Sequence, residues 1–175
     1  MADTTDELAG VVDLFGGLTR EELEQALVEL AFKQGKEVER EAFAAEIDRA
    51  VEDYYLVETA YEGGEAARES RAPTDGERAT GDGAEPVLVA GPAAFPAVPE
   101  NGEDLPHILD VPDRDVDREG LGETVAERLR EEARTAAAAG DTERAELLVD
   151  VSYDLEAWAP VDAADVRETL DRAFE

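Results

Sequence analysis

The excess of acidic side chains constrains this chain more than any other feature of its sequence. The chain holds 46 Asp and Glu residues against 16 Lys and Arg residues over 175 positions, a formal net charge of -30 at pH 7. Such a charge opposes a compact state through self-repulsion in dilute buffer. Near molar salt, screening shortens that repulsion to about 3 Å. The sequence therefore predicts a salt-adapted protein whose surface binds cations weakly and without specificity.

The basic and hydrophobic residues favour the same interpretation. Lys33 and Lys36 lie together in the segment AFKQGK and are the only lysines, so all other basic side chains are arginines. Hydrophobic residues make up 43% of the chain, which is close to the usual share in globular proteins. A disordered acidic protein would lack this share and the apolar periodicity that accompanies it. We therefore expect a folded core.

The residues and segments that the chain lacks narrow the possible classes of protein. It has no cysteine, which excludes disulfide bonds, thiolate metal sites and cysteine nucleophiles. The segment MADTTDELAG has no apolar run of the kind found in secretory signals. No apolar stretch approaches the length that crosses a bilayer. We expect a cytoplasmic protein that is not inserted in a membrane.

Apolar periodicity predicts three helices in the first part of the chain. The first is expected to start near Thr4 or Thr5 and to stop before a pair of glycines. The second is expected to begin with a capping box of Thr19 and Glu22 and to end at Gly35, which suits the left-handed position after a helix. The third is expected to start near Arg40, with apolar side chains on its inner face.

Two short strands are expected to follow these helices. The segments YYLVETAY, at 54–61, and PVLVAG, at 86–91, are rich in β-branched and aromatic side chains. Between them, residues 62–85 have almost nothing to bury and predict a mobile acidic loop. Helix, helix, helix, strand, long loop, strand is the order of a winged helix with a stretched wing. By this pattern alone, residues 1–61 and 86–95 are expected to form a winged-helix-like unit.

The second part of the chain is expected to be helical. Residues 96–116 are predicted to form a proline-rich connector, ordered but irregular, and residues 117–175 a unit of three helices. These helices are expected from about 117 to 139, from about 141 and from about 162. The predicted fold class is mainly α with a small β-hairpin (α+β), a winged-helix-like N-terminal half and a C-terminal helical bundle.

Four basic side chains are candidate nucleic-acid contacts, because a positively charged turn before a recognition helix can touch phosphate. They are Lys33, Lys36, Arg40 and Arg49. The third helix also carries outward acidic side chains such as Glu41, which a duplex would repel. Molar salt would further weaken binding that depends on counterion release. The preferred interpretation of the lysines is that they stabilise the end of the second helix.

Three other side chains are candidate contacts for a protein partner. Phe95 lies among prolines, His107 is the only histidine, and Trp158 is the only tryptophan. Tryptophan is frequent at the energetic centres of interfaces. Each of the three also has a simpler interpretation: Trp158 has the helical spacing of a core residue, and a lone histidine is more often a bystander than a catalyst.

No motif in the chain predicts a catalytic, cofactor or metal site. The segment DVPDRDVDREG opens like a calcium loop, but Arg118 stands where that loop needs glycine and Thr124 where it needs glutamate. The sequence contains no Walker A, G-x-G-x-x-G, H-E-x-x-H or G-x-S-x-G motif. We expect a protein without catalytic residues and without a cofactor.

Three segments carry a resemblance to a known family: ELAGVVDLFGGLTREELEQALVELAFKQG, FPAVPENGEDLPHILDV and YDLEAWAPV. With these segments the chain resembles a small family of uncharacterised, acidic haloarchaeal proteins, a domain of unknown function. The resemblance covers most of the chain outside residues 62–85. It implies a salt-rich archaeal cytoplasm, and it transfers no catalytic or binding residue.

Two functions remain as hypotheses. The first is a non-enzymatic protein-interaction or regulatory module that binds a protein partner or itself. The alternative is a winged-helix DNA-binding transcription regulator, which needs a basic surface. The arrangement of Lys33, Lys36, Arg40 and Arg49 separates the two, because a duplex needs them on one exposed face without acids around them.

The charge predicts that folding depends on salt. We expect the melting temperature to rise by several degrees between about 0.1 M and about 3 M KCl, because screening removes repulsion among the carboxylates. Thermal unfolding followed by circular dichroism at constant pH measures this. An unchanged melting temperature over this range would contradict the salt-adaptation hypothesis.

Overall fold

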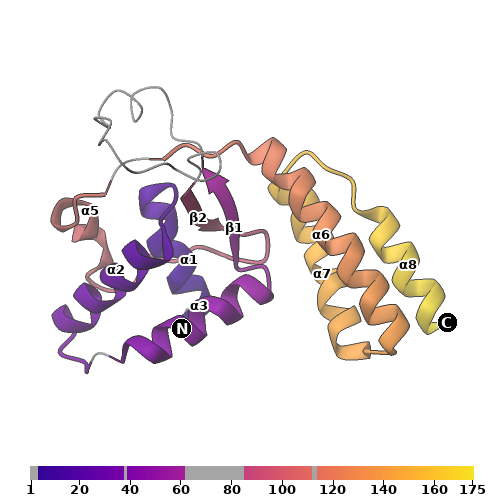
Figure 1. Ribbon diagram of the computed structural model, residues 1–175, viewed down its shortest axis with the longest axis horizontal. Coiled ribbons are helices and arrows are strands. Elements are labelled where there is room, and N and C mark those ends of the chain that lie inside the picture. Colours follow the sequence, from indigo (N-terminus) through magenta and orange to yellow (C-terminus); the bar gives the residue numbers. More distant parts are fainter. Residues whose placement is uncertain (1–3, 38, 62–84, 112–113) are drawn as a thin grey trace, which may run out of the picture.

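The described part of the chain is a mainly helical fold with one two-stranded antiparallel sheet, as its sequence predicts (Figure 1). The computed structural model describes residues 4–37, 39–61, 85–111 and 114–175. The predicted loop at 62–85 therefore lies outside the described residues, apart from Glu85. The elements are α1 (Thr4–Phe15), α2 (Arg20–Lys33), α3 (Arg40–Glu52), β1 (Leu56–Tyr61), β2 (Glu85–Ala90), a 3-10 turn η1 (Gly102–Asp104), α5 (Leu105–Ile108), α6 (Arg118–Ala139), α7 (Thr142–Trp158) and α8 (Ala164–Phe174).

Most helix ends lie where the local sequence predicts them. Gly35 and Gly140 follow α2 and α6 with φ of 66° each, a conformation that glycine adopts without steric cost. The Thr19 hydroxyl accepts a hydrogen bond from the backbone N–H of Glu22 at 3.2 Å, which is half of the predicted capping box. The other half is wrong, because both carboxylate oxygens of Glu22 bind Arg114.

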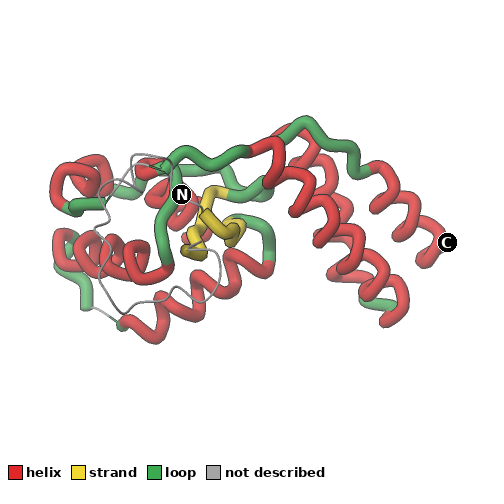
Figure 2. The backbone as a smooth tube through the Cα atoms, turned by 45° about the horizontal axis from the view of Figure 1, so that its top comes forward, coloured by secondary structure: helices red, strands yellow, loops and turns green. Residues whose placement is uncertain are grey.

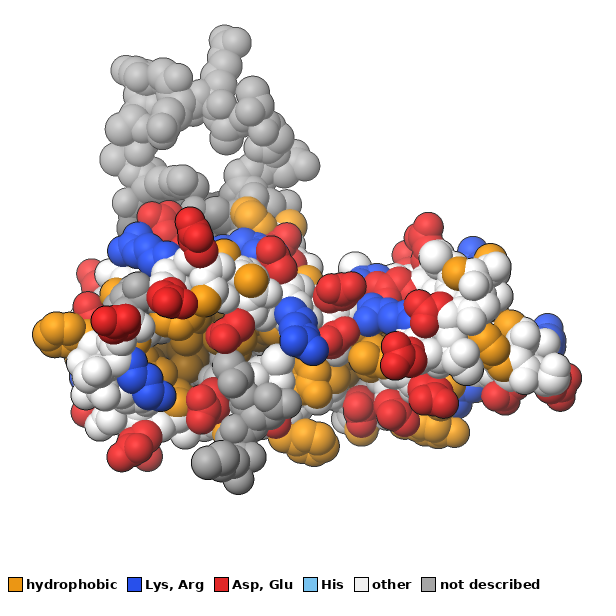
Figure 3. Space-filling view, turned by 90° about the horizontal axis from the view of Figure 1, so that it is seen from below, with side chains coloured by type: hydrophobic (Ala, Val, Ile, Leu, Met, Phe, Trp, Pro, Cys, Tyr) orange, Lys and Arg blue, Asp and Glu red, His pale blue; other side chains and the backbone are white. Residues whose placement is uncertain are grey.

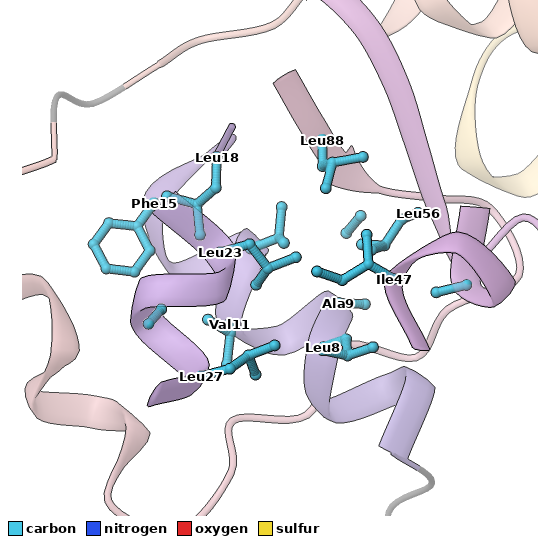
Figure 4. Packing of buried hydrophobic residues seen from close by; sticks show 14 of the residues in the cluster. Leu8, Ala9, Val11, Phe15, Leu18, Leu23, Leu27, Ile47, Leu56 and Leu88 are labelled. Carbon is cyan, nitrogen blue, oxygen red and sulfur yellow. The ribbon is translucent and has the colours of Figure 1, made fainter. Parts of the chain in front are cut away.

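A first core lies among α1, α2, α3 and the sheet (Figure 4). Helix α1 is its centre, since five of its apolar side chains are almost completely buried. Its composition explains this, because α1 carries apolar residues on more than one face and is enclosed by the other two helices. The buried members that surround α1 are Leu18, Leu23, Ala26, Leu27, Ile47, Ala50, Leu56, Leu88, Ala90, Leu105 and Leu109.

The sheet joins this core to the rest of the chain. Strand β1 pairs with β2 in antiparallel register, with Leu56 opposite Ala90. Leu18, between α1 and α2, adds a bridge on the other edge of β2: its N–H donates to the Leu88 carbonyl at 3.0 Å and its carbonyl accepts from Leu88 at 2.6 Å. The segment between α1 and α2 is therefore held against the hairpin.

A second core lies in the bundle of α6, α7 and α8, and the sheet contributes to it as well. Successive side chains of a strand point to opposite faces. Leu56 and Leu88 accordingly belong to the first core, whereas Val57 and Val89 belong to the second. Figure 2 shows the strands between the two groups of helices. The predicted limits of the two units stay predictions, but the hairpin contributes side chains to both cores.

Two arginines connect the bundle to the C-terminal end of α3. The last carbonyls of a helix have no partner within it and carry partial negative charge. Arg128 of α6 donates to the carbonyls of Val51 and Glu52 at 3.1 and 3.3 Å. Arg144 of α7 donates to the Glu52 carbonyl at 2.7 Å and to the Asp53 carboxylate at 2.9 Å. The guanidinium groups thus satisfy helix-terminal acceptors across the junction.

A third arginine fastens the segment before α6 to the other end of the first core. The Arg114 side chain is buried and binds both carboxylate oxygens of Glu22, at 2.7 and 2.8 Å. It also donates to the Gly17 carbonyl at 3.1 Å. A bidentate pair of this kind fixes geometry as well as charge. The predicted connector at 96–116 also contains η1 and α5, so part of it is helical.

Among the described residues, no helix combines the length and the hydropathy that crossing a bilayer requires.

Removing the Arg144 side-chain charge should weaken the junction. In Arg144→Met, the Glu52 carbonyl and the carboxylates of Asp53 and Glu132 lose a donor. We expect the free energy of unfolding to fall by about 1–3 kcal/mol. Urea unfolding in high salt measures this change.

Arg134→Met is the matched control on the same bundle, because Arg134 is exposed and forms no ion pair with the described residues. We expect it to stay within about 0.5 kcal/mol of the wild type. Equal losses in both variants would show that the junction contacts do not stabilise the fold.

Candidate functional site

An apolar groove opens at the surface of the first core. It has a volume of ≈ 210 Å³ and lies among α1, α2, α3 and Pro99 of the connector. Figure 3 views the molecule from the side on which this hollow opens, with an apolar floor and charged groups around it. The floor is formed by Leu8, Val11, Leu27, Leu30, Ala31 and Phe43, and the rim by Glu7, Gln34, Lys36, Glu37 and Glu46.

Helix α2 forms the groove because its apolar stripe extends beyond the cover that the core provides. Leu23 and Ala26, early in the stripe, are completely buried. Towards the end of the helix the exposed fraction rises to 9% for Leu27 and 7% for Leu30. Phe43 of α3 is only partly buried on the opposite side. The last two turns of α2 and the facing part of α3 thus leave a narrow apolar strip at the surface, to which the partly buried Phe43 contributes more than the largely buried leucines do.

The segment AFKQGK ends α2 and places its two lysines differently. The Lys36 N–H donates to the Ala31 carbonyl at 2.8 Å across Gly35, which closes the helix. This turn places Lys36 at the mouth of the groove. Lys33 belongs to the last turn of α2 and forms an ion pair with Asp104 at 3.6 Å. Both lysines therefore lie at the end of α2, and the preferred interpretation, that they stabilise this helix end, stays a prediction.

The rim of the groove is mainly acidic. Glu7, Glu37 and Glu46 face one basic side chain, Lys36. The groove continues into a second, polar hollow of ≈ 350 Å³ that shares three of these rim residues and adds Glu100 and Asn101. At this end the Gln34 side-chain amide donates to the Glu100 carbonyl at 3.0 Å, which connects α2 to the connector. The rim around the apolar floor therefore carries a net negative charge, which favours a positively charged ligand.

The four candidate nucleic-acid contacts do not form one basic face. Lys33 is paired with Asp104, and Lys36 lies beside the glutamates of the groove. Arg40 and Arg49 are nine residues apart in α3, so they point to opposite sides of the helix, about 180° apart. This arrangement lacks the clustered basic surface that a duplex would need.

The three candidate partner contacts lie on three separate elements. Phe95 is 77% exposed just before the connector, and His107 is exposed in α5. Trp158, at the end of α7, is partly buried against the second core, with the Arg118 guanidinium 5.0 Å from its ring centre. None of the three lines the groove.

The groove residues were not predicted as a site. Leu30, Ala31 and Phe43 match the helical periodicity of core residues, so nothing in the sequence separates them from the other apolar side chains of their helices. The sequence contains no signal that shows whether the apolar side chains of a helix are fully covered by neighbouring elements or stay partly exposed. The nearest signal is the pair of lysines in AFKQGK, of which Lys36 belongs to the rim.

Tyr54 marks the junction between the two cores. It is completely buried, and its φ of 67° is rare for a bulky residue. It occupies the position after α3 where glycine is usual, and the following N–H closes the helix on the Ala50 carbonyl at 2.9 Å. The Arg128 guanidinium lies 4.2 Å from the ring centre. The aromatic ring thus fills the space between α3 and the bundle at the cost of local backbone strain.

Burial raises the pKa of the Tyr54 hydroxyl, because the ionised phenol would lose its hydration. The nearby Glu132 carboxylate raises the pKa further, while Arg128 and Arg144 oppose both effects. The hydroxyl is close enough to be influenced by that carboxylate but lacks a hydrogen bond of good geometry with the described residues. The neutral phenol is therefore strongly favoured in the folded protein.

No cluster of three or more potential metal ligands occurs among the residues that the structure describes. The predictions that the chain has no catalytic residues and no cofactor stay predictions.

Comparison with known protein families matches residues 6–175 to a family described as a family of unknown function (DUF7109). The match includes both the groove and the three-helix bundle. No curated protein and no solved structure matches the chain. The predicted resemblance to a family of unknown function is therefore confirmed, and the haloarchaeal source stays a prediction.

The raised pKa of Tyr54 predicts a loss of stability in alkaline solution. Above about pH 10 the unfolded chain releases the phenolic proton while the folded chain keeps it, so the free energy of unfolding falls as the pH rises. Tyr54→Phe should remove up to about 1.4 kcal/mol per pH unit of this slope. Urea unfolding at a series of alkaline pH values measures it.

Tyr153→Phe is the matched control, since that ring is 58% exposed on α7. It should keep the wild-type slope. The same slope in Tyr54→Phe and in the wild type would show that Tyr54 ionises as readily in the folded chain as in the unfolded one.

Proposed function

The chain belongs to the DUF7109 family, whose function is unknown, and we propose that it is a non-enzymatic protein-interaction module. Its recognition surface is the groove among α1, α2 and α3, and its ligand is a segment of a partner protein. We include in this proposal a salt-rich cytoplasm as the working environment, which the net charge of -30 supports.

The open apolar floor is the observation that supports this function best. Most small-molecule pockets measure about 300–1,000 Å³ and enclose their ligand. The groove is smaller, at ≈ 210 Å³, and it opens to the surface (Figure 3). This volume suits one or two apolar side chains of a peptide. Helix-in-groove recognition uses such anchors, spaced one helical turn apart.

The winged-helix interpretation of the first part of the chain fits the same proposal. Its support is the element order from α1 to β2, together with the bridge between Leu18 and Leu88, which holds the segment after α1 on the hairpin. In a DNA-binding winged helix, α3 would face the duplex. Here α3 carries Glu41 and Asp48, and Asp48 binds Arg20. No described feature favours DNA, so we propose a scaffold for protein recognition.

Filling the groove should abolish recognition without unfolding the protein. In Ala31→Phe the added ring occupies the apolar floor, and filling of this kind is neutral or stabilising when no strain results. Selection from a displayed library of random peptides of about 12 residues, with the full chain as bait in high salt, should enrich peptides with apolar anchors. We expect the enriched peptides to bind the wild type and to lose at least about tenfold in affinity, about 1.4 kcal/mol, for Ala31→Phe.

Ala42→Phe adds the same ring at an exposed position of α3 that does not line the groove. This control should bind the selected peptides like the wild type, and the melting temperatures of both variants show whether they fold. A selection that enriches no peptide over the empty support would refute the proposed function. Peptides that bind Ala31→Phe as tightly as the wild type would refute it too.

A further inference from the structure

We infer that the partner segment is a basic amphipathic helix that carries arginine beside its apolar anchors. This inference rests on the proposed function and identifies the chemistry of the ligand. The apolar side chains lie on the floor of the groove, and the guanidinium groups lie against the glutamates of its rim.

Most described arginines are used to neutralise carboxylates elsewhere. Arg20, Arg114, Arg128, Arg130, Arg144, Arg167 and Arg172 all form ion pairs with acidic side chains of the chain. The rim glutamates are distinguished by their place. None of Glu7, Glu37 and Glu46 forms an ion pair with another described residue, as is true of many exposed carboxylates of this chain, but these three lie around one apolar floor. A ligand whose apolar side chains enter the groove would therefore bring its own charged groups into direct contact with these carboxylates.

Arginine suits this rim better than lysine or a free metal ion does. Its planar guanidinium can bind a carboxylate through two parallel hydrogen bonds, and its flat apolar faces can lie on a hydrophobic surface. Glu7 on α1 and Glu46 on α3 line the same groove. Two arginines of one helical segment can therefore each meet a glutamate while the side chains between them enter the floor.

Salt determines how the affinity is divided between the floor and the rim. Near molar salt, charges that are more than about 3 Å apart are screened, so steering at a distance is lost and only direct contacts remain. Burial of apolar surface is not weakened in this way. The floor therefore supplies most of the affinity, and the rim selects between basic and acidic segments.

The same charges disfavour other occupants of the groove. A second copy of the chain has the same net charge of -30 and would bring mainly carboxylates to an acidic rim. A nucleic acid would bring phosphates to it. Lys36 is the exception on the rim, and it can accept one acidic side chain or the C-terminal end of a bound helix. In a basic amphipathic segment, the arginines can bind the rim glutamates and the C-terminal end of the helix can lie beside Lys36.

Three synthetic peptides test this inference. Each has about 12 residues with leucines at the i, i+3, i+4 and i+7 positions. At two flanking positions the first peptide carries arginine, the second glutamine and the third glutamate. Fluorescence anisotropy with the full chain, in about 2 M KCl, measures their dissociation constants. We expect the arginine peptide to bind about tenfold more tightly than the glutamine peptide, and the glutamate peptide to bind most weakly.

A matched pair of charge reversals shows whether the preference for the arginine peptide arises at the rim of the groove. Glu46→Lys reverses one rim charge and should reduce the preference for arginine over glutamine to about threefold or less, because one of the two contacts is lost. Glu41→Lys makes the same change on the exposed side of α3, away from the groove, and should leave the preference unchanged. Thermal unfolding of both variants confirms that the fold is kept.

The outcomes separate this inference from the proposed function. If the arginine and glutamine peptides bind equally and both lose binding in Ala31→Phe, the groove is a recognition site but its ligand is not basic. Tighter binding of the glutamate peptide, or an equal effect of Glu41→Lys and Glu46→Lys, would also overturn the inference. If none of the peptides binds, or if binding survives in Ala31→Phe, both the inference and the proposed function are refuted.

Discussion

The burial of one small hairpin on both faces is the constraint on which the rest of the structure depends. A two-stranded sheet is marginal by itself and needs apolar partners. Here the alternation of side chains along β1 and β2 gives Leu56 and Leu88 to the first core and Val57 and Val89 to the second. Because the strands are shared, neither group of helices can move away without exposing one face of the sheet. Arg128 and Arg144 then close the same junction from the side of the bundle.

The few basic residues of the chain are used where geometry makes a cation most effective. Arg144 joins two carboxylates and a helix-terminal carbonyl, and Arg114 binds both oxygens of Glu22 within a buried site. Exposed carboxylates elsewhere are left to water and salt, which suits a surface that works with screened charges. The groove combines an apolar floor with rim glutamates that form no ion pair with the described residues. That combination makes it a candidate for recognition.

Local rules predicted the elements of this fold well, because they depend on neighbouring residues only. Gly35 and Gly140 end their helices by the left-handed conformation that their lack of a side chain permits. Asp117 caps α6 through its side chain, as its position before an apolar stripe predicts. The capping box failed at Glu22 because Arg114, 92 residues away, offers that carboxylate a bidentate partner. Local sequence contains no information about such a distant competitor.

The sequence by itself determined the helices, the two strands, the acidic surface and the absence of any cysteine chemistry, because periodicity, capping and composition act within a few residues or over the whole surface at once. Only the tertiary structure decided how far each apolar stripe is covered. Leu30 and Phe43 have the pattern of core residues in either case, and they line a groove because α1, α2, α3 and Pro99 diverge at that point. How much of each apolar side chain is covered depends on how the helices are placed relative to one another. That placement depends on contacts between segments that are far apart in the chain.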